Sequence, residues 1–352
     1  MAGSGRPPPP AAPVDDADAR EPYPGALPPA RRSARADAVA ATADKVRRGV
    51  VSFLRILWAN PLSFVGFALV VVIAVMALLA VVAPGLVLLY PPNQLSTAYH
   101  QAPSWAHPLG TDELGRDIYS NVVAALPIDL AIGFSVAGIS LVAGGALGLV
   151  AGYWDRPGTL GGAVSVTIMR LADIFLSFPS LVLALAIAAS IGRTVDGAIV
   201  AVLVTWWPYY VRLARGEVLS VKHQPYVMAA RAAGVREGRI LLRHVLRNVL
   251  EPLVVYFTMD VGTVIVVIST IFYVVQVLPY PSATPEWGSM IQAYQPFLST
   301  YPWMVLAPGL AIFVTVLAFS LLGDGLRDIL DPRSRRAQAE AGSAMLVRRA
   351  EE

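Results

Sequence analysis

Long apolar stretches, interrupted by shorter polar segments, set the pattern of this chain. Because a membrane-crossing helix needs about 20 mostly apolar residues, the pattern predicts six spans, at residues 62–89, 130–154, 174–191, 197–211, 252–278 and 303–323. Pro84 lies near the end of the first span, Pro179 predicts a kink in the third, and Asp260 interrupts the fifth. We therefore expect an all-α integral membrane protein with six transmembrane helices.

Small residues recur at four-residue spacing in the second span: Gly144, Gly148 and Gly152. On a helix these positions share one face, and the absence of side chains there lets a neighbouring helix approach closely. We expect this face to contact another span.

Aromatic residues cluster where spans are expected to end. Trp206 and Trp207 stand directly before Pro208 in the short fourth span. A second group lies before and at the start of the sixth span: Trp287, Tyr294, Phe297, Tyr301 and Trp303. Trp and Tyr favour the membrane–water interface, so both groups are predicted to be interfacial, the second on the outer side.

The composition supports a membrane location and removes several chemistries. The 352 residues are 56% hydrophobic and only 14% charged, whereas about a quarter of a soluble domain is charged. The chain has no cysteine, which excludes disulfides, thiol nucleophiles and zinc–thiolate sites. The lysines, Lys45 and Lys222, precede Val46 and His223, so the Gly-Lys-Ser/Thr signature of a phosphate-binding loop is absent. If the chain uses energy from a nucleotide, that energy must therefore come from another polypeptide.

The distribution of basic residues predicts the orientation of the spans. They gather before the first span (Arg31, Arg32, Arg35, Lys45, Arg47, Arg48, Arg55), between the fourth and fifth (Arg212, Arg215, Lys222, Arg231, Arg236, Arg239, Arg243, Arg247) and after the sixth (Arg327, Arg333, Arg335, Arg336). The loop after the first span has only Arg116, and residues 279–302 have no basic residue. Because basic residues favour the cytoplasmic side, both termini and residues 212–251 are predicted to be cytoplasmic. Residues 1–45 are Pro-rich and lack an apolar core, which indicates a disordered tail rather than a signal peptide.

The segment 226–252 is a patterned polar insert between two spans. Its arginines recur at intervals of three and four residues and would form one stripe on a helix: Arg236, Arg239, Arg243 and Arg247. Apolar residues fall on another face: Leu241, Val245 and Val249. The preference of basic residues for the cytoplasm would account for the charge of this segment but not for its pattern.

Small residues also mark this segment, where Ala229 and Ala230 are followed after three residues by Gly234. Small side chains beside a helix-breaking glycine let the surface of a partner approach a short helix. We predict that a soluble partner docks here and pushes on the membrane subunit.

Two polar blocks adjoin the second and sixth spans. His107 to Asp117 is typical of a turn followed by a helix that Thr111 or Asp112 caps. Its acids lack the spacing of an EF-hand, so we expect it to cap and orient the second span, with contact to an external binding protein as the alternative. Leu322 to Pro332 closes the sixth span, where Gly323 and Gly325 are expected to loosen the helix before Pro332 ends it.

Charged residues within spans are candidates for function. Arg170 and Asp173 are three residues apart and are expected to pair on one helix. Asp260 has no basic residue nearby in the sequence, so it either pairs across helices or faces a transport pathway. Asp260 and Asp173 are the candidate pathway-lining residues. The chain has no His-Glu-x-x-His or Gly-x-Ser-x-Gly motif, and we expect no catalytic, cofactor-binding or metal-binding residue.

The segment 226–252 resembles the cytoplasmic loop of binding-protein-dependent ABC importer permeases, with the pattern Glu-Ala-Ala, three residues, Gly, nine residues, Ile, any residue, Leu, Pro. The residues that match are Ala229, Ala230, Gly234 and Leu246, and those that replace the usual Glu, Ile and Pro are Met228, His244 and Arg247. The spacing of His244, Leu246 and Asn248 is similar to that of the peptide-permease branch. The resemblance implies these ATPase-coupling residues: Tyr226, Ala229, Ala230, Arg231, Gly234, Val235, Arg239 and His244.

The blocks at 107–117, 285–291 and 322–332 resemble signatures of the second permease subunit in dipeptide and oligopeptide importers, with Glu286 where Ser is usual. The resemblance implies a type I ABC importer permease fold with both termini cytoplasmic. It divides the chain into a disordered tail (1–50), the first span with an extracytoplasmic loop (51–125), a core permease domain (126–330) with a coupling loop at 215–250, and a cytoplasmic tail (331–352).

The resemblance also implies an assembly in a prokaryotic cytoplasmic membrane. Its members would be this chain, a homologous second permease, two cytoplasmic ATPase subunits that bind ATP and Mg²⁺, and an extracytoplasmic solute-binding protein. The chain itself would carry no cofactor, bind no nucleic acid, and move a peptide-like or other small solute by alternating access. Two alternatives stay open: an oligosaccharide or nickel-chelate importer permease of the same family, and a stand-alone secondary transporter with ion sites at Asp260 and Asp173.

Overall fold

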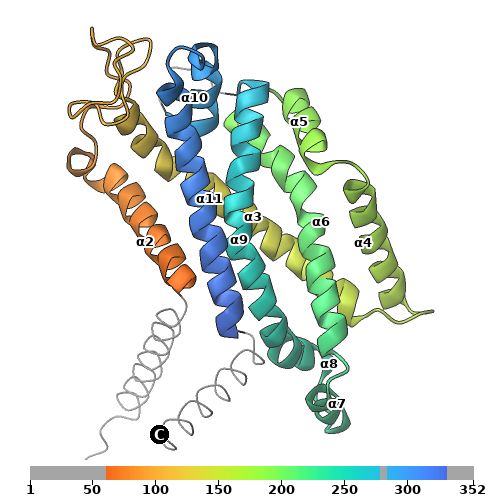
Figure 1. Cartoon of the computed structure of the whole chain (residues 1–352). Helices are drawn as coiled ribbons and strands as arrows, with labels where there is room; N and C mark the ends of the chain where they lie inside the picture. The colour runs from red at the N-terminus through yellow and green to blue at the C-terminus, as the bar shows by residue number, and fades with distance from the viewer. Residues whose placement is uncertain (1–60, 278–283, 331–352) are drawn as a thin grey trace, which may run out of the picture. The chain divides into compact units, whose positions relative to one another are not determined.

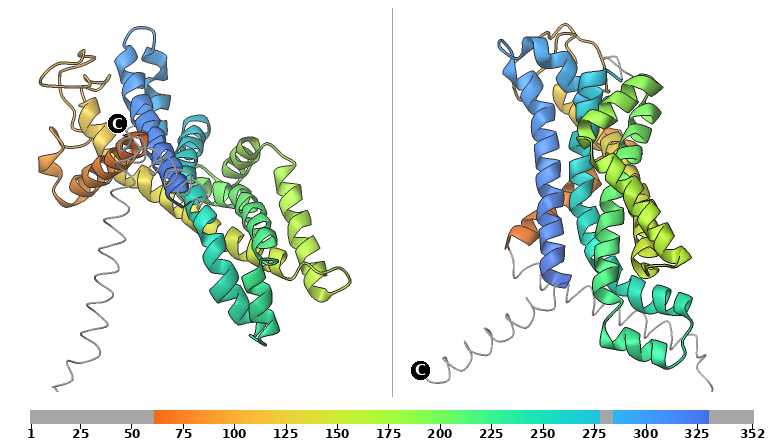
Figure 2. Two further views of the ribbon diagram at one scale, coloured as in Figure 1. Left: turned by 60° about the horizontal axis from the view of Figure 1, so that its bottom comes forward. Right: turned by 90° about the vertical axis from the view of Figure 1, so that its right-hand side faces the viewer.

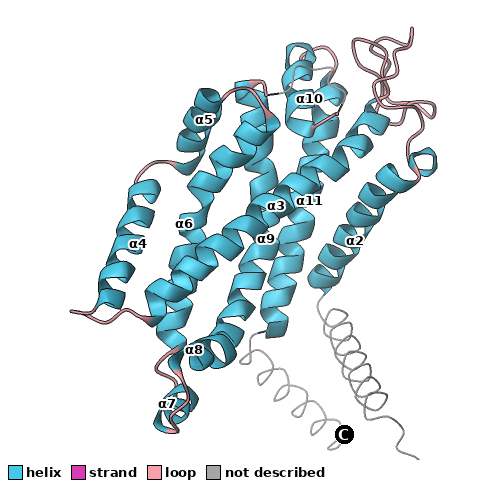
Figure 3. Ribbon diagram, turned by 180° about the vertical axis from the view of Figure 1, so that it is seen from behind, coloured by secondary structure: helices cyan, strands magenta, loops and turns pink. Residues whose placement is uncertain are grey.

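The computed structural model describes residues 61–277 and 284–330 of the chain, and these residues are almost entirely helical (Figure 1). The elements are α2 (Pro61–Val82), η1 (Pro84–Leu86), α3 (Ile118–Tyr153), α4 (Leu160–Leu176), α5 (Ser180–Ile191), α6 (Val195–Val221), α7 (Pro225–Ala232), α8 (Glu237–Ile240), η2 (Leu241–Val245), α9 (Leu246–Val275), α10 (Trp287–Tyr294), η3 (Gln295–Phe297) and α11 (Pro302–Leu330). No strand occurs in the described ranges (Figure 3). Thr111 and Asp117 form an isolated β-bridge.

The helices that can cross a membrane agree in number with the six predicted spans. Five are long and apolar enough: α2, α3, α6, the continuous run Glu237–Val275, and α11. The pair α4 and α5, which is bent by 84° at its break, makes a sixth if the two helices are counted as one span. Pro179 stands directly before α5 and cannot continue a helix from α4, so the predicted kink is a sharp break between two helices.

The boundaries of several spans differ from the prediction. Helix α3 begins at Ile118, well before the expected residue 130, and α6 continues to Val221 instead of ending at residue 211. The extra turns contain polar residues that hydropathy assigns to loops. In α3, Ser120 and Asn121 are buried, and hydrogen bonds to Asp117 at the start of the helix satisfy their polar groups.

The glycine face of α3 packs directly against α6, as predicted. A Cβ atom added to Gly148 would lie 2.6 Å from the carbonyl oxygen of Val211 and 2.7 Å from the Cβ of Ala214. Gly144 and Gly152 meet α6 in the same way, one helical turn before and after. The two helices are therefore in backbone contact, which only glycine at these positions permits.

The glycines near the end of α11 also serve close contact, so the expectation that they loosen the helix is wrong. Helix α11 continues through both, and added Cβ atoms would lie 2.6 Å from the Cβ of Ser63 at Gly325 and within van der Waals radii of Met259 at Gly323. These contacts attach α11 to α2 and to α9. Asp331 and Pro332, and the basic residues of both tails, lie outside the described residues.

Two small groups of helices occupy opposite ends of the bundle. Helices α7 and α8 lie at one end, and α10 lies at the other, beside the loop that joins η1 to α3 (Figures 1 and 2). This separation agrees with the prediction that the segment 212–251 and the loop 279–302 are on different sides of the membrane.

Candidate functional site

The hairpin of α7 and α8, defined here as residues 222–240, carries most of the predicted coupling residues. Helix α7 ends in a Schellman motif, in which the Val235 amide donates to the Ala230 carbonyl (3.2 Å) and the Gly234 amide to the Arg231 carbonyl (3.0 Å). Gly234 has φ +76°, a left-handed conformation that strains other residues. No atom lies within 4 Å of its added Cβ. The glycine therefore sets a tight turn on an open surface.

Most exposed residues of α7 are small or apolar. Tyr226, Met228 and Ala229 are exposed, whereas Val227 is buried against the bundle. Of the other predicted coupling residues, Arg239 is exposed, Val235 and His244 are half-buried, and Ala230 packs at the edge of the core. The structure therefore gathers the predicted set on one hairpin, with His244 just beyond it in η2.

An ion pair inside the hairpin is fastened to the end of α3. Arg231 Nε donates to Glu237 Oε1 at 2.8 Å, and the hydroxyl of Tyr153, the last residue of α3, donates to the other oxygen of the Glu237 carboxylate. The hydrogen bond to Glu237 raises the pKa of the Arg231 guanidinium, so the pair stays charged. Sequence reasoning missed Tyr153 and Glu237, although Glu237 is the single acid between residues 226 and 250 and its isolation among arginines was a usable signal.

A second contact joins the start of the hairpin to α3. The Lys222 ammonium donates to the Gly152 carbonyl at 2.9 Å. Burial lowers the pKa of Lys222 below its ordinary value, and the negative charge of Asp155 opposes this shift. Both ends of the hairpin are thus attached to α3, so a force on the hairpin acts directly on a membrane-spanning helix.

The arginine stripe and the apolar face beyond the hairpin separate as predicted. The stripe is exposed: Arg236, Arg239, Arg243 and Arg247. The apolar residues are buried: Leu241, Val245 and Val249. The π-helical turn η2 connects α8 to α9, so that Glu237–Val275 is one continuous helical run.

Asp173 has a different partner from the one expected. Its carboxylate accepts a hydrogen bond from Arg212 of α6 at 2.6 Å, whereas Arg170 on its own helix was predicted to pair with it. Both partners are about half exposed (52% and 45% of the side chain). The pair joins α4 to α6 near the surface of the bundle, and Asp173 lines neither of the cavities described below.

Asp260 is buried in the middle of α9, with 4% of the residue exposed, and it binds across helices to α6. Trp206 Nε1 lies 3.0 Å from Oδ1 and 2.9 Å from Oδ2, and the Tyr210 hydroxyl donates to Oδ2 at 2.8 Å. The expectation that Trp206 is interfacial is therefore wrong, because its indole N–H is needed inside the bundle. Sequence reasoning missed this role, although the four-residue spacing of Trp206 and Tyr210 places both on one face of a helix.

A cavity of about 390 Å³ opens beside this carboxylate, defined here as the Asp260 cavity. It is lined by Trp206, Tyr209, Tyr256, Met259, Asp260 and Thr263. The walls are aromatic, with the Trp206 and Tyr209 rings 5.4 Å apart. Thr263 is exposed, so the cavity reaches the surface of the α6–α9 layer.

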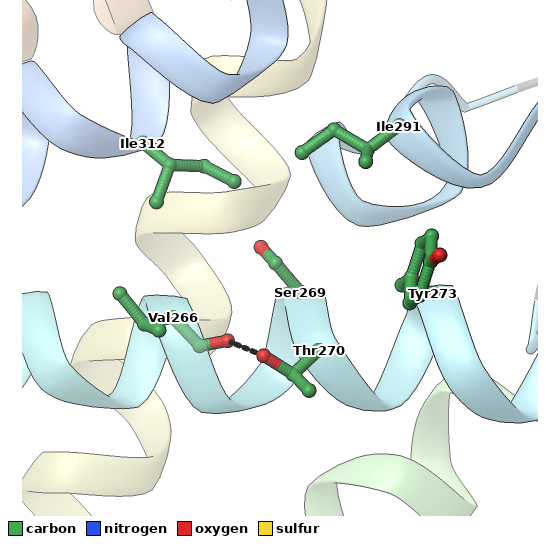
Figure 4. A pocket seen from close by; sticks show the side chains of 6 residues that line it. All are labelled: Val266, Ser269, Thr270, Tyr273, Ile291 and Ile312. Carbon is green, nitrogen blue, oxygen red and sulfur yellow. Dashed lines mark hydrogen bonds between the residues drawn. The ribbon is translucent and has the colours of Figure 1, made fainter. Parts of the chain in front are cut away.

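A second, smaller cavity of about 200 Å³ lies between α9, α10 and α11 (Figure 4). Two of its polar groups already have partners: the Thr270 hydroxyl donates to the Val266 carbonyl at 2.7 Å, and the Ser269 hydroxyl donates to Glu286 Oε1 at 3.2 Å. The remaining lining side chains are mostly apolar, including Ile291 and Ile312. It therefore has fewer polar groups available to bind a solute than the Asp260 cavity has.

The block His107 to Asp117 orients α3, as predicted, but a different residue caps the helix. Asp117, instead of Thr111 or Asp112, accepts from the Ser120 amide at 2.7 Å, and the His107 ring lies 2.9 Å from its other oxygen. Asp112 instead forms a buried ion pair with Arg116 (2.7 Å). The Tyr294 hydroxyl donates to the same Asp112 oxygen at 3.2 Å.

Two of the predicted interfacial aromatics belong to the core at this end. Trp287 and Tyr294 of α10 are fully buried, and the Trp287 indole donates to the Val122 carbonyl of α3 at 3.0 Å. The carboxyl groups of Glu286 and Asp129 are buried together and interact directly beside Trp287. Burial raises the pKa of the Glu286 carboxyl to about 7.

Five to six candidate spans, with a short helical hairpin at one end of the bundle, define a polytopic helical membrane protein. Residues 144–336 match the family described as "binding-protein-dependent transport system inner membrane component", and the chain belongs to this family. It is a non-catalytic transmembrane permease component of a binding-protein-dependent importer, in the inner membrane, as expected.

Three relatives are similar over most of the chain. The dipeptide transport system permease protein DppC of Alkalihalophilus pseudofirmus is 37% identical over 78% of this chain and 87% of its own length. The probable D,D-dipeptide transport system permease protein DdpC of Escherichia coli K12 is 38% identical over 76% and 88%. The glutathione transport system permease protein GsiD of Pectobacterium atrosepticum is 38% identical over 66% and 75%.

Proposed function

We propose that this chain moves short peptides through the membrane by alternating access, with a homologous second permease as the other half of the pathway. Two ATPase subunits would bind ATP and Mg²⁺ and hydrolyse the ATP, and a solute-binding protein would deliver the peptide on the opposite side. The family of the chain supports the binding protein and the ATPases as partners. We propose the second permease, and two as the number of ATPases, from the resemblance to peptide importers alone.

The attachment of the hairpin to α3 is the observation that carries the proposed mechanism. The Arg231–Glu237–Tyr153 contacts and the Lys222–Gly152 hydrogen bond leave the hairpin little freedom to move without α3. Helix α3 in turn is in backbone contact with α6, which bears two of the aromatic walls of the Asp260 cavity. A push on the hairpin would therefore reach the cavity through rigid elements instead of a flexible loop.

The relatives support a peptide as the solute. Their names describe transport of dipeptides, D,D-dipeptides and glutathione, which share a short amide backbone and a free α-amino group. We therefore propose di- and tripeptides as the substrate class of this chain.

Replacing Gly234 by Glu tests the proposed coupling. The position is open within this chain, so a new side chain meets no other residue here and would obstruct a docked partner, while the left-handed backbone adds a strain that the control below shares. In proteoliposomes with the complete complex and its binding protein, we expect Gly234→Glu to reduce uptake of labelled Ala-Ala and stimulation of ATP hydrolysis by about tenfold or more. Amounts of assembled permease should stay as in the wild type.

Gly158→Glu is the matched control. Gly158 lies in the loop between α3 and α4, has φ +75°, and likewise has nothing within 4 Å of its added Cβ. The backbone strain and the added charge are thus the same, at a position outside the hairpin. Equal loss of uptake in both variants, or normal uptake in Gly234→Glu, would show that the hairpin is not the coupling site.

A further inference from the structure

The Asp260 cavity combines a buried carboxylate with aromatic walls, which is the chemistry that recognises an organic ammonium ion. The carboxylate accepts hydrogen bonds from neutral donors, Trp206 and Tyr210. Within the described residues it forms no ion pair with a Lys, Arg or His side chain. Its negative charge is therefore held in place, but it is not neutralised by this part of the chain.

The walls of the cavity fit a cation better than a neutral solute. Trp206, Tyr209 and Tyr256 contribute the aromatic side chains, and the Tyr256 ring also packs edge-to-face on Tyr210 at 5.1 Å, which fixes its orientation. A cation within about 6 Å of such ring faces is attracted by their electron density, more strongly where water is scarce. Thr263 and Met259 add a hydroxyl and a polarisable sulfur at the edge.

A metal ion is a poor occupant of the same space. No group of three or more His, Cys, Asp or Glu side chains suited to a metal occurs among the residues that the structure describes. A single carboxylate leaves a divalent cation short of oxygen ligands. A primary ammonium needs only one strong acceptor together with a polarisable surround, and the volume of about 390 Å³ admits it with part of a peptide attached.

We propose that the Asp260 cavity is a binding subsite for the α-ammonium group of the transported peptide. The inference rests on the proposed function, because peptide transport brings such a group to the membrane interior. Asp260 provides the charge, Trp206 and Tyr210 hold the carboxylate in a fixed orientation, and Tyr209 and Tyr256 enclose the cation. A peptide with a blocked amino terminus would lose this contact wherever else it binds.

Binding to the complex without its binding protein tests the subsite directly. The probes are Ala-Ala-amide, a cation, and N-acetyl-Ala-Ala-amide, its neutral counterpart, measured by equilibrium dialysis with the purified permease–ATPase complex. Measurements with and without a non-hydrolysable ATP analogue sample both conformations of the alternating-access cycle. In at least one of them the wild-type complex should bind the cation more tightly, and Asp260→Asn should weaken that binding by about tenfold or more while leaving the neutral probe unchanged.

Two further variants keep the test decisive. Tyr256→Leu removes an aromatic face without touching the Trp206–Asp260 contacts and should weaken cation binding about two- to fivefold, even if Asp260→Asn fails to assemble. Asp173→Asn removes a carboxylate from another span, outside the cavity, and should leave binding of both probes unchanged. Equal affinity of the two probes for the wild type, or unaltered cation binding in both cavity variants, would overturn the proposal.

The two proposals fail in different ways. If the Gly234→Glu complex loses uptake of Ala-Ala and the cavity variants bind Ala-Ala-amide like the wild type, the ammonium subsite is wrong and the proposed function stands. If the wild-type complex takes up no peptide, the proposed function fails, whatever the dialysis shows.

Discussion

Single glycines decide where the helices of this protein can touch. Gly148 allows α3 to meet the backbone of α6, whereas Gly138 on the same helix has its nearest neighbour, Phe257, 4.0 Å from an added Cβ. The packing of α3 on α6 therefore requires glycine at position 148, whereas position 138 has room for a larger side chain.

Gly148→Ala should destabilise the protein and Gly138→Ala should not. A methyl group at Gly148 would overlap the Val211 carbonyl, and such overpacking costs about 1–3 kcal/mol. At Gly138 the same change relieves the entropic cost of glycine in a helix and is expected to be neutral or stabilising by up to about 1 kcal/mol. Thermal unfolding of the purified chain in detergent checks both. Equal midpoints for the two variants would contradict the close α3–α6 contact.

At the residue scale, the sequence predicted which residues share a helix face, but it did not predict which side chains bind one another across helices. The glycine face, the exposed arginine stripe and the turn at Gly234 all follow from local periodicity or backbone conformation. The partners of Asp173 and Asp260 could not be predicted, because Arg212 and Trp206 lie 39 and 54 residues away and depend on how α6 packs. Trp206 and Trp287 were misplaced for the same reason, since a buried indole N–H bound to a partner looks like an interfacial one in sequence.

At the scale of elements, α10 is held in place by buried groups at the end of the bundle opposite the hairpin. Glu286 caps α10 by accepting from the Gly288 amide at 2.9 Å and the Ser289 amide at 2.7 Å. Its carboxyl is buried beside that of Asp129 in α3, so deprotonation places charge in an apolar setting next to a second acid.

The stability of this end should fall as pH rises. Burial raises the pKa of Glu286 from 4.5 to about 7, so the folded protein binds more protons than the unfolded chain between these values. The stabilising contribution is therefore complete below pH 4.5 and is lost as pH rises through about 7. Between pH 5 and 8, the thermal midpoint of the wild type should fall by several degrees relative to Glu286→Gln, which cannot titrate. Parallel pH profiles of the two proteins would contradict this account.

Element boundaries depend on contacts that hydropathy does not contain. The first turns of α3 are polar because Asp117, Ser120 and Asn121 bond one another there, and the last turns of α6 carry Arg212 and Arg215, which pair with Asp173 and Asp155. The break between α4 and α5 was signalled by Pro179, but its angle of 84° was not, because a proline limits the helix without fixing the direction of the next one.

At the scale of the whole molecule, the hairpin and the Asp260 cavity are connected through α3 and α6. The existence and number of the spans could be predicted because about 20 apolar residues are needed wherever a helix crosses a bilayer. The family could be inferred because Ala229, Ala230 and Gly234 of the hairpin stand at the spacing of the family's cytoplasmic loop. The cavity could not, since its lining comes from two helices whose register only the packing defines.

The claim that the hairpin receives the ATPase can be tested by cross-linking, and the absence of native cysteine makes the design simple. Ala229→Cys places a thiol on the exposed side of α7, and Ser299→Cys places an exposed thiol at the α10 end. Each variant of the assembled complex is labelled with a benzophenone maleimide and irradiated. The account predicts an adduct between Ala229→Cys and the ATPase subunit and none from Ser299→Cys. An unlinked Ala229→Cys, or an ATPase adduct at Ser299→Cys instead, would contradict it.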